Sequence, residues 1–123
     1  MAELRIEAGG LVVELSELEK IGAFRGDVRV PLTAVRDVRV AEDPRLELRG
    51  MRAPGTGFPG VIALGSRRGQ GHDFAAVYRN RPAVVVDLDG AEFDRLVITV
   101  PDPESTAAAV RTAVAEASGR AGG

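Results

Sequence analysis

The chain of 123 residues has 16 lysine and arginine and 18 acidic side chains, a formal net charge of −2 and 45% hydrophobic residues. This balance is that of a single folded domain, and it excludes both a disordered chain and a global attraction to nucleic acid. The sequence has no cysteine, which excludes disulfides and thiolate metal sites and fits a cytoplasmic location. Neither a signal peptide nor an apolar run of about 20 residues is visible. We therefore expect no membrane anchor, whereas peripheral contact with a membrane stays open.

The N-terminal residues predict a β-hairpin followed by a helical turn. Apolar and charged residues alternate over residues 3–8, and the apolar face resumes after the two-residue turn expected at Gly9-Gly10. The segment Ser16–Ile21 begins with the Ser-x-x-Glu spacing of a capping box, which predicts a short helical turn.

The middle of the chain combines extended segments with turns. An extended segment is expected over residues 24–30, then a turn at 31–34 and a strand at 36–40. Residues 45–50 fit either a helical turn or an edge strand. Residues 52–60, rich in glycine and proline, form the longest irregular stretch.

Four further strands are predicted, over residues 61–67, 73–79, 83–88 and 93–100. Good turn residues join the first three, and we expect all four to pair in order as a meander. Apolar residues do not alternate cleanly in the first and third of these strands. This pattern indicates burial on both faces of the sheet.

The clearest helix signal follows the last strand. Asp102 is suited to the N-cap, and the proline after it fits the first helical position. One helix is therefore predicted over residues 103–117, with Val110 and Val114 in a narrow apolar stripe that packs on the sheet. Residues 119–123 are expected to be a disordered tail.

Two segments, residues 30–38 and residues 96–104, resemble parts of bacterial pleckstrin-homology-like (PH-like) domains. The first is similar to their early turn and strand, and the second to their last strand and helix start. Residues 52–60 and 73–87 also look like those of small uncharacterised bacterial proteins of this group. The resemblance implies a mainly β fold with a C-terminal helix, namely an antiparallel barrel of about seven or eight strands capped by one helix. It implies a single domain over residues 1–118 that binds or scaffolds, with no catalytic residues to carry over.

The residue pattern predicts no enzyme, no cofactor and no metal. His72 is the only histidine, and we expect it to be a solvated loop residue without a catalytic role. The carboxylates Asp87, Asp89, Glu92 and Asp94 flank one turn, but they lack the fixed offsets of a calcium loop. A solvated hairpin end is the preferred interpretation.

One candidate binding site combines the glycine-rich stretch with arginines. The loop lacks the ending of a phosphate-binding P-loop, but its backbone amides could form an anion-binding nest. Strand pairing predicts that Arg67 and Arg68 lie near Asp73 and, one strand further, near Asp87, at the end of the sheet away from this loop. A structural rim of salt bridges is the competing interpretation. The expected ligand-binding residues are Arg52, Gly55, Thr56, Gly57, Arg79 and Arg81.

The sequence therefore favours a non-enzymatic interaction or scaffold module that binds a protein partner. The alternative is a binder of a small anionic or phosphorylated ligand, held by the loop over residues 54–60 and the neighbouring arginines. Self-association stays open as well, because an open barrel leaves an edge strand unpaired.

Overall fold

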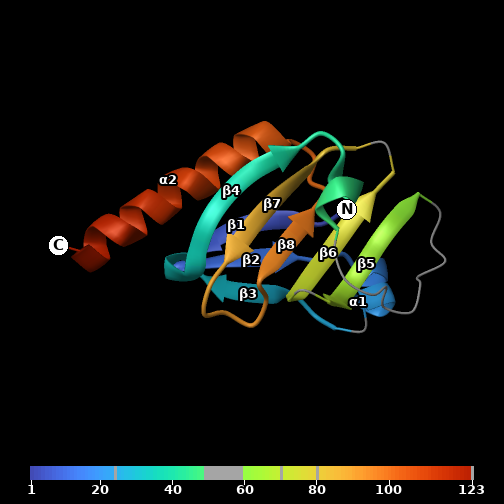
Figure 1. Ribbon diagram of the computed structural model, residues 1–123, viewed down its shortest axis with the longest axis horizontal. Coiled ribbons are helices and arrows are strands. Elements are labelled where there is room, and N and C mark those ends of the chain that lie inside the picture. The colour runs from blue at the N-terminus through green and yellow to red at the C-terminus, as the bar shows by residue number, and fades with distance from the viewer. Residues whose placement is uncertain (24, 49–59, 70, 80, 123) are drawn as a thin grey trace.

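Two β-sheets and one long C-terminal helix build the protein, as its computed structural model shows (Figure 1). The structure describes residues 1–23, 25–48, 60–69, 71–79 and 81–122. The three-stranded sheet has the order β1-β2-β3 and consists of β1 (Glu3–Glu7), β2 (Gly10–Glu14) and β3 (Val28–Pro31). The five-stranded sheet has the order β4-β7-β8-β6-β5 and consists of β4 (Val35–Ala41), β5 (Val61–Arg68), β6 (His72–Tyr78), β7 (Ala83–Leu88) and β8 (Arg95–Ile98). The helical segments are α1 (Glu17–Ala23), η1 (Leu32–Ala34), η2 (Pro44–Glu47) and α2 (Pro103–Gly122).

The predicted N-terminal hairpin is present, but its turn lies one residue earlier than expected. Ala8 and Gly9 both have positive φ, at 37° and 81°, as the two central residues of a type I′ hairpin turn require. Gly10 already pairs with Glu7 as the first residue of β2. The expected turn at Gly9-Gly10 is therefore wrong by one position.

The capping box predicted at the start of α1 is confirmed. The backbone N–H of Ser16 donates to Oε1 of Glu19 at 2.8 Å, and the backbone N–H of Glu19 donates to Oγ of Ser16 at 3.3 Å. These reciprocal bonds satisfy two amides that have no partner within the helix. Residues 45–50, for which two interpretations were open, begin as the 3₁₀ helix η2.

The predicted meander is wrong, because β8 lies between β6 and β7 (Figure 1). It pairs in parallel with β6 and antiparallel with β7. The hydroxyl of Thr99 extends this contact by accepting from the backbone N–H of Tyr78 at 3.1 Å. Crossing the end of β8 means spanning two strand spacings, about 10 Å. Residues 79–82 can reach about 13 Å when extended, so this short connection suffices.

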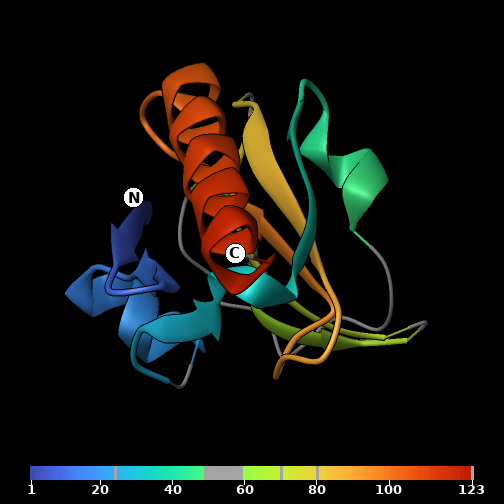
Figure 2. The same cartoon turned by 90° about the vertical axis from the view of Figure 1, so that its left-hand side faces the viewer.

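The C-terminal helix covers the sheets as predicted. The backbone N–H of Ser105 donates to Oδ1 of Asp102 at 3.2 Å, which confirms the N-cap. Val110 is buried and Val114 is half-buried against the core between the sheets. Figure 2 shows α2 lying across the space between the two sheets. The helix runs to Gly122, beyond its expected end near residue 117.

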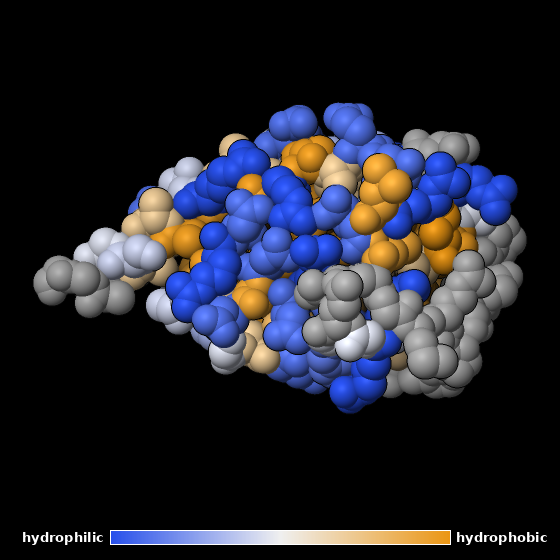
Figure 3. Space-filling model, viewed as in Figure 1, coloured by the Kyte–Doolittle hydropathy of each residue, from blue (hydrophilic) through white to orange (hydrophobic). Residues whose placement is uncertain are grey.

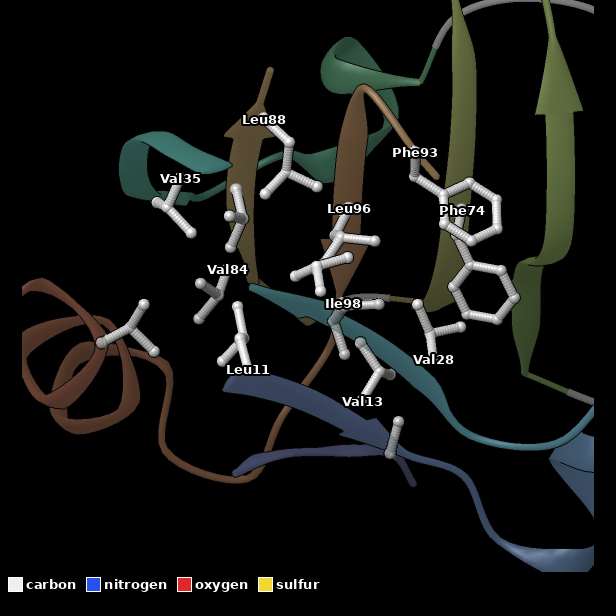
Figure 4. Close-up of a cluster of buried hydrophobic side chains, with 14 of the residues drawn as sticks. Leu11, Val13, Val28, Val35, Phe74, Val84, Leu88, Phe93, Leu96 and Ile98 are labelled. Atoms are coloured by element: carbon white, nitrogen blue, oxygen red, sulfur yellow. The ribbon is translucent and has the colours of Figure 1, made fainter. Parts of the chain in front are cut away.

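The main core lies between the two sheets, where their side chains point toward one another (Figure 4). Its largest fully buried side chains include Phe74, Phe93, Leu11, Leu96 and Ile98. A second cluster on the other face of the five-stranded sheet consists of Ala63, Ala75, Val77, Ala83, Val85 and Val97. The predicted burial on both faces of this sheet is thus confirmed.

The structure confirms a mainly β protein with a C-terminal helix. Among the described residues, no strand of one sheet pairs with a strand of the other, so the two sheets do not close into the expected barrel. Within the same residues, no helix is both long and apolar enough to cross a membrane.

Candidate functional site

A surface pocket of about 340 Å³ lies between the segment that follows β4, including the start of η2, and the residues at the start of β5 and the end of β6. The antiparallel pairing of β4 with β7 forms one side of the pocket. Ala41 pairs with Ala83, so Glu42, which follows β4, and Arg81, which precedes β7, lie at the same end of the sheet. The other side is held by the backbone N–H of Arg79, which donates to the carbonyl of Gly60 at 2.7 Å. The pocket is lined by Glu42, Asp43, Pro44, Arg45, Ile62, Tyr78, Arg79 and Arg81.

The start of η2 fixes one wall of the pocket. Asp43 is the N-cap of η2, and its Oδ1 accepts from the backbone N–H of Arg45 at 3.3 Å and from its Nε at 3.2 Å. The hydrogen bond from the Arg45 side chain holds the pKa of Asp43 below its ordinary value. Asp43 and Arg45 therefore form an ion pair with each other at the rim of the pocket.

Tyr78 lines the pocket, but its hydroxyl is engaged in a hydrogen bond within the protein. The hydroxyl donates to Oε2 of Glu19 at 2.7 Å, and only 2% of Glu19 is exposed. Burial, followed by the hydrogen bond to the Glu19 carboxylate, raises the pKa of Tyr78. Tyr78 therefore stays neutral and is held in place by Glu19.

Arg79 and Arg81, both predicted as site residues, line this one pocket and are exposed. Within the described part of the chain, neither arginine lies within ion-pairing distance of a carboxylate. The other predicted ligand-binding residues, Arg52, Gly55, Thr56 and Gly57, lie outside the described residues. The predicted glycine nest over residues 54–60 falls there as well, apart from Gly60, whose carbonyl binds the amide of Arg79.

Glu42, Asp43 and Arg45 were not predicted for this site. Their place in the pocket depends on the pairing of β4 with β7, which joins residues far apart in the chain. The local signal was the Asp-Pro step at the start of η2, which indicates a helix cap and carries no information on what lies opposite.

A row of charged side chains crosses the outer face of the five-stranded sheet. It was expected to place Asp87 next to Asp73, but Arg95 of β8 pairs with both and stands between them. The predicted pairing of Arg67 with Asp73 is confirmed. Hydrophilic residues are prominent on this face of the protein (Figure 3). The row, in strand order, is Asp37, Asp87, Arg95, Asp73 and Arg67.

The charges at the centre of this row neutralise one another. Oδ1 of Asp87 accepts from Nε of Arg95 at 2.6 Å, and its Oδ2 accepts from Nη1 of Arg39 at 2.7 Å. Arg39 also donates to the carboxylates of Asp37 and Glu47. Burial raises the pKa of Asp87, but the hydrogen bonds from Arg39 and Arg95 outweigh it and hold the pKa below its ordinary value. Each of these side chains thus has an oppositely charged partner within the network.

His72 was expected to be a solvated loop residue, and this is wrong. It begins β6 and is half-buried, because its ring lies 4.5 Å from the ring of Phe93. Its Nδ1 lies 3.2 Å from the carbonyl oxygen of Glu92. Arg25 packs over the other side of this cluster, 5.2 Å from the centre of the Phe93 ring. The histidine thus belongs to a packed contact between β6 and the turn before β8.

The four carboxylates of that turn are each held by a partner within the protein. Asp87 binds the two arginines above, Asp89 pairs with Arg36, and Glu92 pairs with Arg25. Asp94 accepts from the backbone N–H of His72 at 2.8 Å. Within the described ranges, no group of three or more histidine or acidic side chains is placed to hold a metal ion.

The fold and the pocket together define a class: a mainly β protein of two sheets and a C-terminal helix, with a charged surface pocket at one end of the larger sheet. No protein-family model, curated protein or solved structure matches the chain. The pocket chemistry is therefore what carries a functional argument.

Proposed function

We propose that the protein is a non-enzymatic PH-like interaction module that binds acidic side chains of a protein partner in the pocket at Arg79 and Arg81. One observation carries this proposal. The two arginines line the same pocket, are exposed, and lack a carboxylate partner in the described part of the chain. The core between two sheets, covered by a C-terminal helix, supports the PH-like part.

The contrast with the other arginines strengthens the argument. Among the arginines whose side chains the structure describes, only Arg68, Arg79 and Arg81 have no partner. Arg68 lies at the opposite end of β5, where it pairs in register with His72. Two unpaired guanidinium groups in one pocket match carboxylate geometry, because each presents a planar fork of N–H donors.

The groups that line the pocket favour binding over catalysis. A guanidinium group stays protonated at ordinary pH and cannot act as a base, and the Tyr78 hydroxyl is bound to Glu19. Asp43 is bound to Arg45. The lining that the described residues form has no serine, threonine, lysine or histidine that could act as a nucleophile or a base.

A small phosphorylated ligand is the second candidate function. The same two arginines would bind a phosphate group bidentately, and a pocket of about 340 Å³ is large enough for a small molecule. The two candidate functions differ in the anion that the arginines bind: a carboxylate of a protein partner in the first, and a phosphate group of a small ligand in the second.

Titration by calorimetry at low and high salt tests the proposal, with a glutamate-rich peptide and inorganic phosphate as the probes. We expect the peptide to bind wild type, with an affinity that falls as salt rises, because exposed charges are screened. The double variant Arg79→Ala/Arg81→Ala should lose binding. The double variant Arg36→Ala/Arg68→Ala removes the same charge far from the pocket and should keep it.

Equal loss of binding in both double variants would show that net charge alone attracts the peptide, and the site would be wrong. Binding of phosphate without binding of the peptide would favour the second candidate. A melting temperature far below wild type in Arg79→Ala/Arg81→Ala would assign the two arginines a structural role instead.

A further inference from the structure

The pocket that holds Arg79 and Arg81 also presents an unpaired negative charge. Glu42 follows β4, and Arg81 shortly precedes β7, on neighbouring strands whose last pair is Ala41 with Ala83. Glu42 is exposed and lines the pocket. Among the described residues it has no cation within ion-pairing distance, although arginines line the same pocket.

The ion pair next to Glu42 explains why the pocket presents both positive and negative side chains. Asp43, the next carboxylate, is turned toward Arg45 because it caps η2. Arg45 is in turn held by Asp43, so it does not neutralise Glu42. Among the described residues, this leaves one carboxylate and two guanidinium groups without an ion-pair partner around one pocket.

Part of the lining between these charges is apolar. Ile62 and the buried Pro44 lie there, next to the half-buried Tyr78. Such a surface packs against the carbon stem of a long charged side chain while the charged head stays at the rim.

We infer, building on the proposed function, that the partner segment carries a basic side chain close to its acidic one, with Glu42 binding the basic residue and Arg79 and Arg81 binding the acidic residue. Residues two apart in an extended segment project from the same face, about 7 Å apart. An acidic and a basic residue at this spacing would meet both signs of the pocket at once. An all-acidic segment would still bind at Arg79 and Arg81, but more weakly, because Glu42 repels its other carboxylates.

Two peptides that differ in one residue test this inference. Both are extended, glycine-based and acetylated, and both have one glutamate; two residues later, one has lysine and the other has glutamine. We expect wild type to bind the lysine peptide roughly two- to fivefold more tightly, the size of one exposed ion pair. Amide chemical shifts should change around the pocket for both peptides.

The variant Glu42→Gln should abolish the preference for lysine and leave the affinity for the glutamine peptide equal or higher. Glu116→Gln is the matched control, because Glu116 is an exposed carboxylate on α2, away from the pocket. It should keep the preference. Glu42 accepts no hydrogen bond in the described structure, so Glu42→Gln should melt like wild type.

The outcomes separate this inference from the proposed function. If both peptides bind equally to wild type and Arg79→Ala/Arg81→Ala abolishes both, the anion site stands and the inference is overturned. If neither peptide binds, both fail. Free 5-aminopentanoate has the same two charged groups on a short carbon chain. If it bound as tightly as the lysine peptide, the assignment to a protein segment would be overturned.

Discussion

The hydroxyl of Tyr78 and the carboxylate of Glu19 are joined by a hydrogen bond of 2.7 Å that links the larger sheet to α1. Glu19 is 2% exposed, and its other oxygen accepts from the backbone N–H of Ser16 in the capping box. One buried carboxylate therefore closes a helix end and anchors a strand residue at the same time. Because Tyr78 also lines the pocket, this contact fixes one of its walls.

Removing the Tyr78 hydroxyl should destabilise the protein while preserving its packing. Tyr78→Phe leaves a buried Glu19 oxygen without its donor, so the free energy of unfolding should fall by about 1.5–3 kcal/mol, as for hydrogen bonds to charged groups. Urea unfolding measures this change. An unchanged midpoint would mean that water replaces the hydroxyl without loss. Binding at Arg79 and Arg81 should persist, because the substitution leaves both arginines in place.

The ionisation of Tyr78 can be measured without interference from other tyrosines, because it is the only tyrosine in the chain. Burial and Glu19 raise its pKa in the folded protein. The folded state then holds its proton at a pH where the unfolded state releases it. Stability is therefore full below the unfolded pKa of about 10 and is lost as pH rises toward the folded pKa.

Phenolate absorbance at increasing pH checks this. We expect no titration near pH 10 in native protein and a normal titration in urea, with a pKa of about 10. If the native protein titrated like the denatured one, Tyr78 would be solvated. Tyr78→Phe should also remove part of the alkaline loss of stability.

Local chemistry was predictable from sequence, and the order of strands was not. The reciprocal bonds of Ser16 and Glu19, and the cap at Asp102, depend on residues three positions apart, so spacing alone reveals them. The position of β8 between β6 and β7 has no such signal, because a short apolar strand fits either neighbour equally well.

In the pocket, too, features that depend on neighbouring residues were predictable and those that depend on strand pairing were not. Arg79 and Arg81 were predicted as a pair, since they flank one turn in the chain. The role of Glu42 depends on Ala41 pairing with Ala83, a contact that residue spacing does not encode. Predicting which charges meet required the strand register first.

The packing of α2 onto the sheets leads to a graded prediction. Val110 is 1% exposed, so Val110→Ala should lower the free energy of unfolding by about 2–3 kcal/mol through lost burial and a cavity. Asp102→Ala should cost about 1 kcal/mol through loss of the cap. Thr112→Ala, at an exposed position of the same helix, serves as the control and should stay within about 0.5 kcal/mol of wild type. Urea unfolding gives all three values, and an order of cost other than Val110, Asp102, Thr112 would contradict the packing of α2 on the core.

Asp87, the carboxylate at the centre of the charged row, should make the free energy of unfolding depend on pH in the acidic range. Asp87 binds both Arg39 and Arg95, and these bonds lower its pKa in the folded protein. The unfolded state, with a pKa of about 3.9, then binds a proton at a pH where the folded state does not. The contribution of Asp87 is therefore full above about pH 5 and is lost as pH falls through the folded pKa.

Asp87→Asn should consequently cost about 1–3 kcal/mol at neutral pH, since it leaves two partly buried guanidinium groups short of an acceptor. At about pH 3 the difference from wild type should shrink, because the carboxyl of the unfolded wild-type protein is then largely protonated, which favours unfolding. Asp89→Asn is the control: its pair with Arg36 is exposed, with 70% and 65% of the two side chains accessible, and should matter little at either pH. Urea midpoints of the three proteins at both pH values test this. A difference for Asp87→Asn that does not change with pH would show that packing of the side chain, and not its charge, holds β4, β7 and β8 together.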